Sequence, residues 1–155
     1  MIFAVAGTQL PFARLFGALE QVAARHQLPV IAQTGEPART SASMECHARI
    51  APARFEAIMA QCDVVVAHAG IGVIIAAATH RKPLILMPRR ASLGEHRNDH
   101  QLATAAQFRD RPGIVIVHDE AELEAALLRV NPPALGLAGS ERREALIGAL
   151  RAAIV

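Results

Sequence analysis

The chain has 155 residues, which is the size of one domain with a core of its own. Hydrophobic residues make up 52% of it but aromatic residues only 3%, so the core must be built from Ala, Val, Leu and Ile. The formal charge of +2 is spread along the chain without a basic block, which argues against non-specific nucleic-acid binding. The scarcity of aromatic rings also argues against stacking platforms for bases or sugars.

Short apolar runs alternate with amphipathic segments along the chain. In chain order we predict a strand over 2–6, a helix over 14–25, a strand over 29–32, a loop over 34–43, a weak strand over 44–50, a helix over 52–61, a strand over 63–67, a helix over 73–79, a strand over 84–87, a polar loop over 88–97, a helix to 108, a strand over 113–117 and a helix over 120–129 capped by Asp119. Strands that alternate with helices at this spacing predict an α/β domain with a parallel sheet, whose ligands lie at the carboxyl ends of the strands.

The remainder of the chain, residues 131–155, is predicted to hold a hinge and a final helix. Asn131-Pro132-Pro133 breaks the pattern, and a helix from Ser140 carries Leu146, Ile147, Leu150 and Ile154 on one side. This apolar side would dock on a partner or on the domain's own sheet.

Cysteine usage and the chain's first residues predict a cytoplasmic location. Cys46 and Cys62 are not at metal-ligand spacing and are interpreted as two reduced, buried thiols. The start of the chain has no positively charged region and is interpreted as a strand, not as a signal peptide. No apolar run approaches the ~18 residues that a membrane span needs.

The segment from Asp63 to Ala78 carries the clearest functional signal. It is an apolar run that breaks at His68, Gly70 and Gly72 before an apolar helix resumes. A strand followed directly by a helix aims the free N–H groups of the helix start at whatever lies above the sheet, which suits a phosphate. The glycines let a ligand approach the backbone, and His68 would donate a hydrogen bond to it. The alternative is a core histidine with no ligand.

Three segments fall at the carboxyl ends of predicted strands and would line one cleft. They are 7–9, 68–72 and 88–101. The third is crowded with polar side chains, which is how a polyhydroxyl ligand is held. It also allows two other interpretations: a solvated loop capped by Asn98 or Asp99, or a metal site made by Glu95, His96 and His100 with the two histidines four residues apart on a helix.

Several nucleotide-binding motifs fit poorly. Gly70-Ile71-Gly72 with Ile75 is an incomplete G-x-G-x-x-G and follows a late strand, so a nicotinamide-binding domain is disfavoured. The sequence has neither a Walker lysine nor a G-x-S-x-G nucleophile.

The order His68-Ala-Gly-Ile-Gly72, Lys82-Pro-Leu-Ile-Leu-Met-Pro88 and Asn98-Asp-His-Gln101 resembles the carboxyl-terminal, donor-binding half of GT-B glycosyltransferases of family 28. It is similar to the donor-binding subunit of two-part GlcNAc and glucuronosyl transferases of dolichol-linked and bacterial exopolysaccharide synthesis. The resemblance covers residues 1 to about 130 and implies one Rossmann-like, nucleotide-sugar-binding domain.

The resemblance also implies roles for particular residues. The diphosphate would be held by the 7–9 loop and the start of the helix after His68, the sugar by 95–101, and the nucleobase by backbone near Ile50. The implied catalytic residue is His68. The implied donor-binding residues are Gly7, Thr8, Gln9, Ile50, His68, Ala69, Gly70, Gly72, Arg89, Arg90, Glu95, His96, Asn98, Asp99, His100 and Gln101. Ala76 stands where many relatives carry a Glu for the ribose.

A complete GT-B enzyme has a second Rossmann-like domain that binds the acceptor. The resemblance therefore implies a UDP-sugar-dependent hexosyltransferase, active with a membrane-associated acceptor-binding subunit on a lipid-linked acceptor, with no metal or other cofactor. Arg89, Arg90 and Arg97 flank the sugar segment and raise the hypothesis of a uronic-acid donor, since a carboxylate matches an arginine fork. The alternatives are GlcNAc or glucose as the sugar, a non-catalytic nucleotide-sugar-binding protein, or a sugar-nucleotide epimerase.

Overall fold

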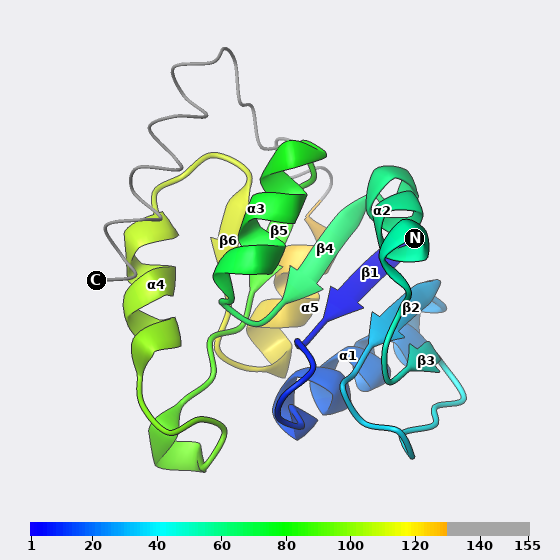
Figure 1. Cartoon of the computed structure of the whole chain (residues 1–155), viewed down its shortest axis with the longest axis horizontal. Coiled ribbons are helices and arrows are strands. Elements are labelled where there is room, and N and C mark those ends of the chain that lie inside the picture. The colour runs from blue at the N-terminus through cyan, green and yellow to red at the C-terminus, as the bar shows by residue number, and fades with distance from the viewer. Residues whose placement is uncertain (130–155) are drawn as a thin grey trace.

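The computed structural model describes residues 1–129, in which six parallel strands form one sheet (Figure 1). The strands are β1 (Ile2–Val5), β2 (Val30–Gln33), β3 (Glu45–His47), β4 (Val64–Ala67), β5 (Leu84–Leu86) and β6 (Ile114–Ile116). Their order across the sheet is β3-β2-β1-β4-β5-β6. This is the order of a doubly wound Rossmann fold, so the predicted fold class is confirmed. The predicted hinge and final helix lie outside the described residues.

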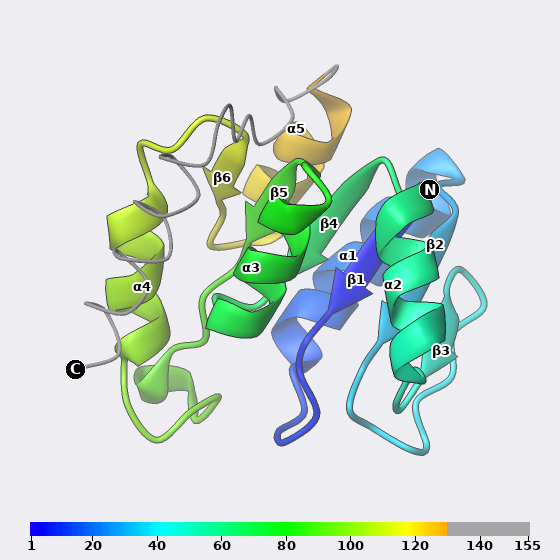
Figure 2. The same ribbon diagram turned by 45° about the horizontal axis from the view of Figure 1, so that its top comes forward.

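The helices form a layer on each face of this sheet. They are α1 (Ala13–His26), α2 (Pro52–Gln61), α3 (Ile71–Thr79), α4 (His100–Phe108) and α5 (Glu120–Leu128), with a short 3₁₀ turn η1 (Ala91–Leu93). Figures 1 and 2 show α1 and α5 on one face and α2, α3 and α4 on the other. Among the described residues, no helix is long and apolar enough to cross a membrane.

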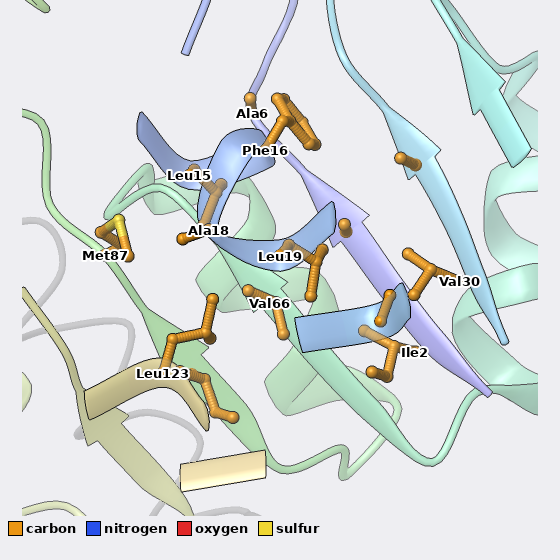
Figure 3. Packing of buried hydrophobic residues seen from close by; sticks show 14 of the residues in the cluster. Ile2, Ala6, Leu15, Phe16, Ala18, Leu19, Val30, Val66, Met87 and Leu123 are labelled. Atoms are coloured by element: carbon orange, nitrogen blue, oxygen red, sulfur yellow. The ribbon is translucent and has the colours of Figure 1, made fainter. Parts of the chain in front are cut away.

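The core is divided by the sheet because alternate residues of each strand point to opposite faces. In β1, Ile2 packs toward α1 and α5, whereas Phe3 packs toward α2, α3 and α4. Figure 3 shows the first of these layers, where Leu19 and Leu123 meet the sheet residue Val66. Both faces are covered, which explains why the central strands are continuous apolar runs.

Most predicted boundaries hold within two residues, and the differences have local causes. Helix α3 begins at Ile71, two residues before the predicted start, because Gly70 is its N-cap. Helix α4 begins only at His100. The predicted Asp119 cap is confirmed, since its carboxylate accepts a 2.8 Å hydrogen bond from the Glu122 N–H. Cys62 is buried, but Cys46 is only partly buried because β3 is an edge strand, and neither is in a disulfide.

The sheet order places a topological switch point between β1 and β4. The chain leaves β1 toward β2 on one side and leaves β4 toward β5 on the other. The ends of the two central strands are therefore not covered by a crossover, and ligands of doubly wound sheets bind there. The Gly7 loop follows β1 and His68 follows β4, so the sequence segments of interest meet at this point.

Candidate functional site

A cavity of about 270 Å³ opens at the switch point, between the loops that follow β1, β4 and β5. It is lined by Ala6, Gly7, Thr8, Gln9, Leu10, His68, Arg89, His96 and Gln101. Seven of these nine residues belong to the predicted donor-binding set. None of the lining residues is acidic, whereas one is an arginine and two are histidines, so the cavity suits an anion.

His68 lines the cavity, and its ring is held by a hydrogen bond to the backbone of β1. Its Nδ1 lies 3.2 Å from the Val5 carbonyl oxygen, which only accepts, so Nδ1 carries the proton. Burial lowers the pKa of His68 to about 4, with Arg89 and His96 acting in the same direction and the Val5 carbonyl opposing them. The neutral ring therefore presents the lone pair of Nε2 to the cavity. Donation from His68 to a ligand, as expected from the sequence, would therefore require a proton at Nε2.

The ring leaves no space at the adjacent glycine. A Cβ built on Gly70 would lie 2.3 Å from His68 Nε2, and one built on Gly7 would lie 3.3 Å from the same atom. Gly7 also has a φ of +77°, in the region that favours glycine. The position of the histidine therefore favours glycine at both positions, and the positive φ favours it further at Gly7.

Helix α3 presents the free N–H groups of its first turn at this edge of the sheet. Its N-cap is Gly70, and no side chain caps the helix. The uncapped end carries a partial positive charge that an anion can satisfy. Gly72 lies inside the first turn, and a Cβ there would meet nothing within 4 Å. Ala69 is buried, so only its backbone is available to a ligand.

Arg89 is held by main-chain carbonyls. Its side chain is buried, and its two terminal nitrogens donate to the carbonyl oxygens of Leu10 and Pro11 at 2.6 Å, of Ala6 at 3.0 Å and of Glu95 at 3.2 Å. The guanidinium also lies 4.4 Å from the centre of the Phe12 ring. Of the three arginines in the uronic-acid hypothesis, Arg89 therefore does not present its guanidinium to a donor carboxylate, because both terminal nitrogens hold the backbone of the cavity rim.

Glu95 is engaged in an ion pair with a residue from α1. Arg14 donates to both carboxylate oxygens of Glu95 at 2.7 Å, and the Arg90 N–H donates to the same carboxylate at 2.9 Å. Burial would raise the pKa of Glu95, but the hydrogen bonds from Arg14 and Arg90 and the charges of Arg14 and Arg89 outweigh it and lower the pKa. Glu95 is thus ionised, and its ion pair with Arg14 joins the β5–α4 loop to α1 outside the cavity lining.

The segment from Asn98 to Gln101 shapes the turn into α4. The Asn98 side-chain oxygen accepts from the His100 N–H at 3.3 Å, whereas the Asp99 carboxylate accepts from the Ala91 N–H at 2.8 Å and does not cap the helix. Gln101 lines the cavity and accepts from the Arg89 N–H at 3.1 Å. Of the two predicted caps, Asn98 is thus the one that bonds the helix start.

The metal-site interpretation of this loop is wrong. His96 precedes α4, so it does not share a helix face with His100, and Glu95 is paired with Arg14. Within residues 1–129, no group of three or more His, Cys, Asp or Glu side chains is placed to hold a metal ion. His96 instead lines the cavity, where its buried Nδ1 has no partner among the described residues.

At Ile50, where the nucleobase is expected, one of the two backbone polar groups is already engaged. The Ile50 N–H already donates to the side-chain oxygen of Gln33 at 2.9 Å, which leaves the Ile50 carbonyl for a ligand. Ile50 lies after β3, beyond the cavity lining. Ala76 is partly buried on α3.

Sequence reasoning missed the residues that position the site from a distance. The sequence places Arg14 at the start of a predicted helix and Gln33 just after a predicted strand, yet these two residues hold Glu95 and Ile50. Each contact joins residues far apart in the chain. In the sequence, Arg14 and Gln33 stand out only as polar residues beside a buried segment, and this pattern does not indicate which residue each one contacts.

The fold and the cavity define a nucleotide-binding type of α/β domain: a doubly wound parallel sheet with a cationic hollow and a free helix start at its switch point. The chain belongs to the glycosyltransferase family 28 C-terminal domain, which matches residues 1–149. The resemblance seen in the sequence is thereby confirmed, and the match extends past residue 130. No curated protein matches the sequence.

Solved structures of glycosyltransferases share this fold at low identity. The solution structure of ALG13 is 16% identical with a TM-score of 0.65, covering 94% of this chain and 93% of ALG13. Acinetobacter baumannii MurG is 17% identical with a TM-score of 0.59, covering 97% of this chain and 44% of MurG. Arabidopsis thaliana UGT89C1 complexed with UDP-L-rhamnose is 16% identical with a TM-score of 0.61, covering 99% of this chain and 38% of that enzyme. The chain therefore spans less than half of these two larger enzymes.

Proposed function

We propose that this domain binds the donor of a UDP-sugar-dependent glycosyltransferase, with the diphosphate in the switch-point cavity. The observation that carries the proposal is the meeting of His68 and the Gly7 loop in a cavity without acidic lining residues, with the uncapped start of α3 at Gly70, two residues after His68. Membership of family 28 supports a sugar nucleotide as the ligand.

The geometry suggests how transfer would be assisted. An acceptor hydroxyl attacks the anomeric carbon, the bond from that carbon to the diphosphate breaks, and the hydroxyl proton passes to a base that the acceptor side supplies. Negative charge then develops on the leaving diphosphate. We propose that the N–H groups at the start of α3 and the His68 ring stabilise that charge, and the uncapped helix start and the position of His68 in the cavity lining support this role. On this proposal, no metal is required.

We also propose that the domain acts as the donor-binding subunit of a two-component enzyme, cytoplasmic and held at the membrane by an acceptor-binding partner. The acceptor would be a lipid-linked sugar in polysaccharide synthesis. Support comes from membership of family 28 and from the fold that the chain shares with ALG13. A non-catalytic nucleotide-sugar-binding protein is the competing function.

Calorimetry with UDP in the presence of a chelator tests the binding site. We expect binding without metal, and we expect His68→Ala to weaken it by about 1–3 kcal/mol, the contribution of one hydrogen bond to a charged group. His80→Ala is the matched control, because His80 pairs with Glu56 at the far end of α3. Failure of the chain to bind UDP, or unchanged binding by His68→Ala, would contradict the proposed site.

Transfer assays test the two-component arrangement. The purified chain alone should not transfer sugar to a lipid acceptor, whereas the chain mixed with an acceptor-binding glycosyltransferase subunit should. Robust transfer by the chain alone would disprove the need for a partner. Binding without transfer in any combination would favour the non-catalytic alternative.

The sugar itself is best tested with paired donors. Arg89 does not present its fork, so a uronic-acid preference would depend on Arg90, which is half-buried, or Arg97, which is exposed. If that preference exists, UDP-glucuronic acid should bind more tightly than UDP-glucose, and Arg90→Ala or Arg97→Ala should remove the difference. Equal binding of both donors would leave GlcNAc or glucose as the sugar.

A further inference from the structure

The hydrogen bond that His68 makes to the backbone leaves its ring in the state opposite to what a bound diphosphate needs. Its Nδ1 proton is engaged by the Val5 carbonyl, and its Nε2 lone pair has no partner among the described residues. A phosphate oxygen carries only lone pairs, so it would repel Nε2 in this state. Some change at the ring must therefore accompany binding at this position.

We propose that the diphosphate binds to this cavity together with one proton, which His68 takes up from solvent at Nε2. The proposal rests on the proposed donor site and adds to it the protonation state of its central residue. The new Nε2–H bond then donates to a phosphate oxygen, while Nδ1 keeps its bond to Val5. When the UDP product leaves, the proton returns to solvent.

A change of tautomer is the other way to place a donor at Nε2, and the geometry disfavours it. Moving the proton from Nδ1 to Nε2 would turn the Nδ1 lone pair toward the Val5 oxygen, 3.2 Å away. Two lone pairs would then face each other, and the Val5 carbonyl would keep only its 3.2 Å bond from the His68 backbone N–H. Rotation of the ring is also restricted, because His68 fits closely between Gly7 and Gly70, with a Cβ on Gly70 only 2.3 Å from Nε2. Protonation keeps both the ring position and the existing bond.

The groups around His68 explain why the proton is absent before binding and present after it. Burial is the main reason that the pKa of His68 is about 4, and Arg89 and His96, which face the ring from the β5–α4 loop, lower the pKa further. The β1 loop contributes Gly7, Thr8 and Gln9, and α3 begins with Gly70 and Ile71, none of which titrates. No carboxylate lines the cavity, so the two negative charges of a diphosphate are the first opposite charges that the ring meets.

The test is calorimetry with UDP-GlcNAc, whose diphosphate is esterified at both ends and keeps its charge across the neutral range. Titrations at one pH in buffers of different ionisation enthalpy should show uptake of about one proton per donor bound. Between the His68 pKa values of the free and bound states, affinity should rise about tenfold for each unit of falling pH.

Two variants assign the proton to a residue. His68→Gln keeps a side-chain N–H near the Nε2 position but does not titrate, so its binding should be independent of pH and free of proton uptake. His96→Gln should keep the uptake, as should His80→Gln on the surface. Uptake that survives in His68→Gln, or that disappears in His96→Gln, would overturn the assignment to His68.

Nitrogen NMR of the wild-type ring gives a second readout that does not depend on a variant's folding. His68 should be the neutral Nδ1–H tautomer in the free protein and doubly protonated in the UDP-GlcNAc complex. A neutral ring in the complex, or binding without proton uptake, would overturn this inference while leaving the proposed donor site intact. Absence of any nucleotide-sugar binding would overturn both.

Discussion

Replacement of Arg89 by Met tests whether the rim of the cavity depends on one buried cation. The substitution keeps an unbranched side chain but removes four hydrogen bonds to the carbonyls of Ala6, Leu10, Pro11 and Glu95. At about 1.5–3 kcal/mol for each bond to a charged group, the gross loss is roughly 6–12 kcal/mol. Relief of the cation's burial offsets several kcal/mol of this, so we expect a net loss of about 3–5 kcal/mol.

Urea unfolding measures this loss. A domain of this size has a stability of about 5–15 kcal/mol and a urea slope of about 1–3 kcal/mol per molar, so the midpoint should fall by at least about 1 M in Arg89→Met. The matched control is Arg90→Met, because that side chain is half-buried and has no hydrogen bond among the described residues. It should change stability by less than about 0.5 kcal/mol. A midpoint for Arg89→Met as close to wild type as that of the control would refute the reasoning.

Three further predictions concern the glycines, the histidine and the last described helix. Gly70→Ala should displace the His68 ring, because the new Cβ would lie 2.3 Å from Nε2, and it should weaken UDP binding in calorimetry. Gly72→Ala has open space around its Cβ and should stabilise α3 by about 0.5–1 kcal/mol. Gly72→Ala should weaken UDP binding only if the ligand approaches that backbone. The pKa of His68 is about 4 in the folded state and about 6.5 in the unfolded state, so the unfolded state binds more protons between these pH values. Acidification across this range should therefore lower the unfolding free energy of the ligand-free wild type by roughly 3 kcal/mol. The unfolding free energy of His68→Gln should not show this loss. Asp119→Ala removes the cap of α5 and should lower the unfolding free energy by about 1 kcal/mol in the same urea assay, whereas equal stability would contradict the capping role.

The elements that could be predicted from the sequence are those specified by local patterns. The run from Val64 to Ala67 is apolar throughout because both faces of the central sheet are covered, and Pro52 begins α2 where its ring is tolerated. The sequence also predicts that Gly7 and His68 lie at the same edge of the sheet, because the carboxyl ends of parallel strands meet at one edge.

The roles of polar side chains in the site depended on contacts that local patterns do not contain. Glu95 and Arg89 stand in a segment that suggests sugar binding, but their partners are Arg14 and the carbonyls of the β1 loop, about 80 residues earlier. The strand order that brings these partners together is a property of the whole chain. The state of His68 likewise depends on the Val5 carbonyl of the neighbouring strand.

The way Arg89 holds the β1 loop has a consequence for how the domain can diversify. Within the β1 loop, the hydrogen bonds from Arg89 go to the main-chain oxygens of Ala6, Leu10 and Pro11, and none goes to the side chains of Thr8, Gln9 or Leu10. These three side chains are exposed at the mouth of the cavity. On the proposed function, substitutions at residues 8–10 would alter the choice of donor while Arg89 keeps the loop backbone in place, which makes these residues the natural target for libraries that seek new sugar specificity.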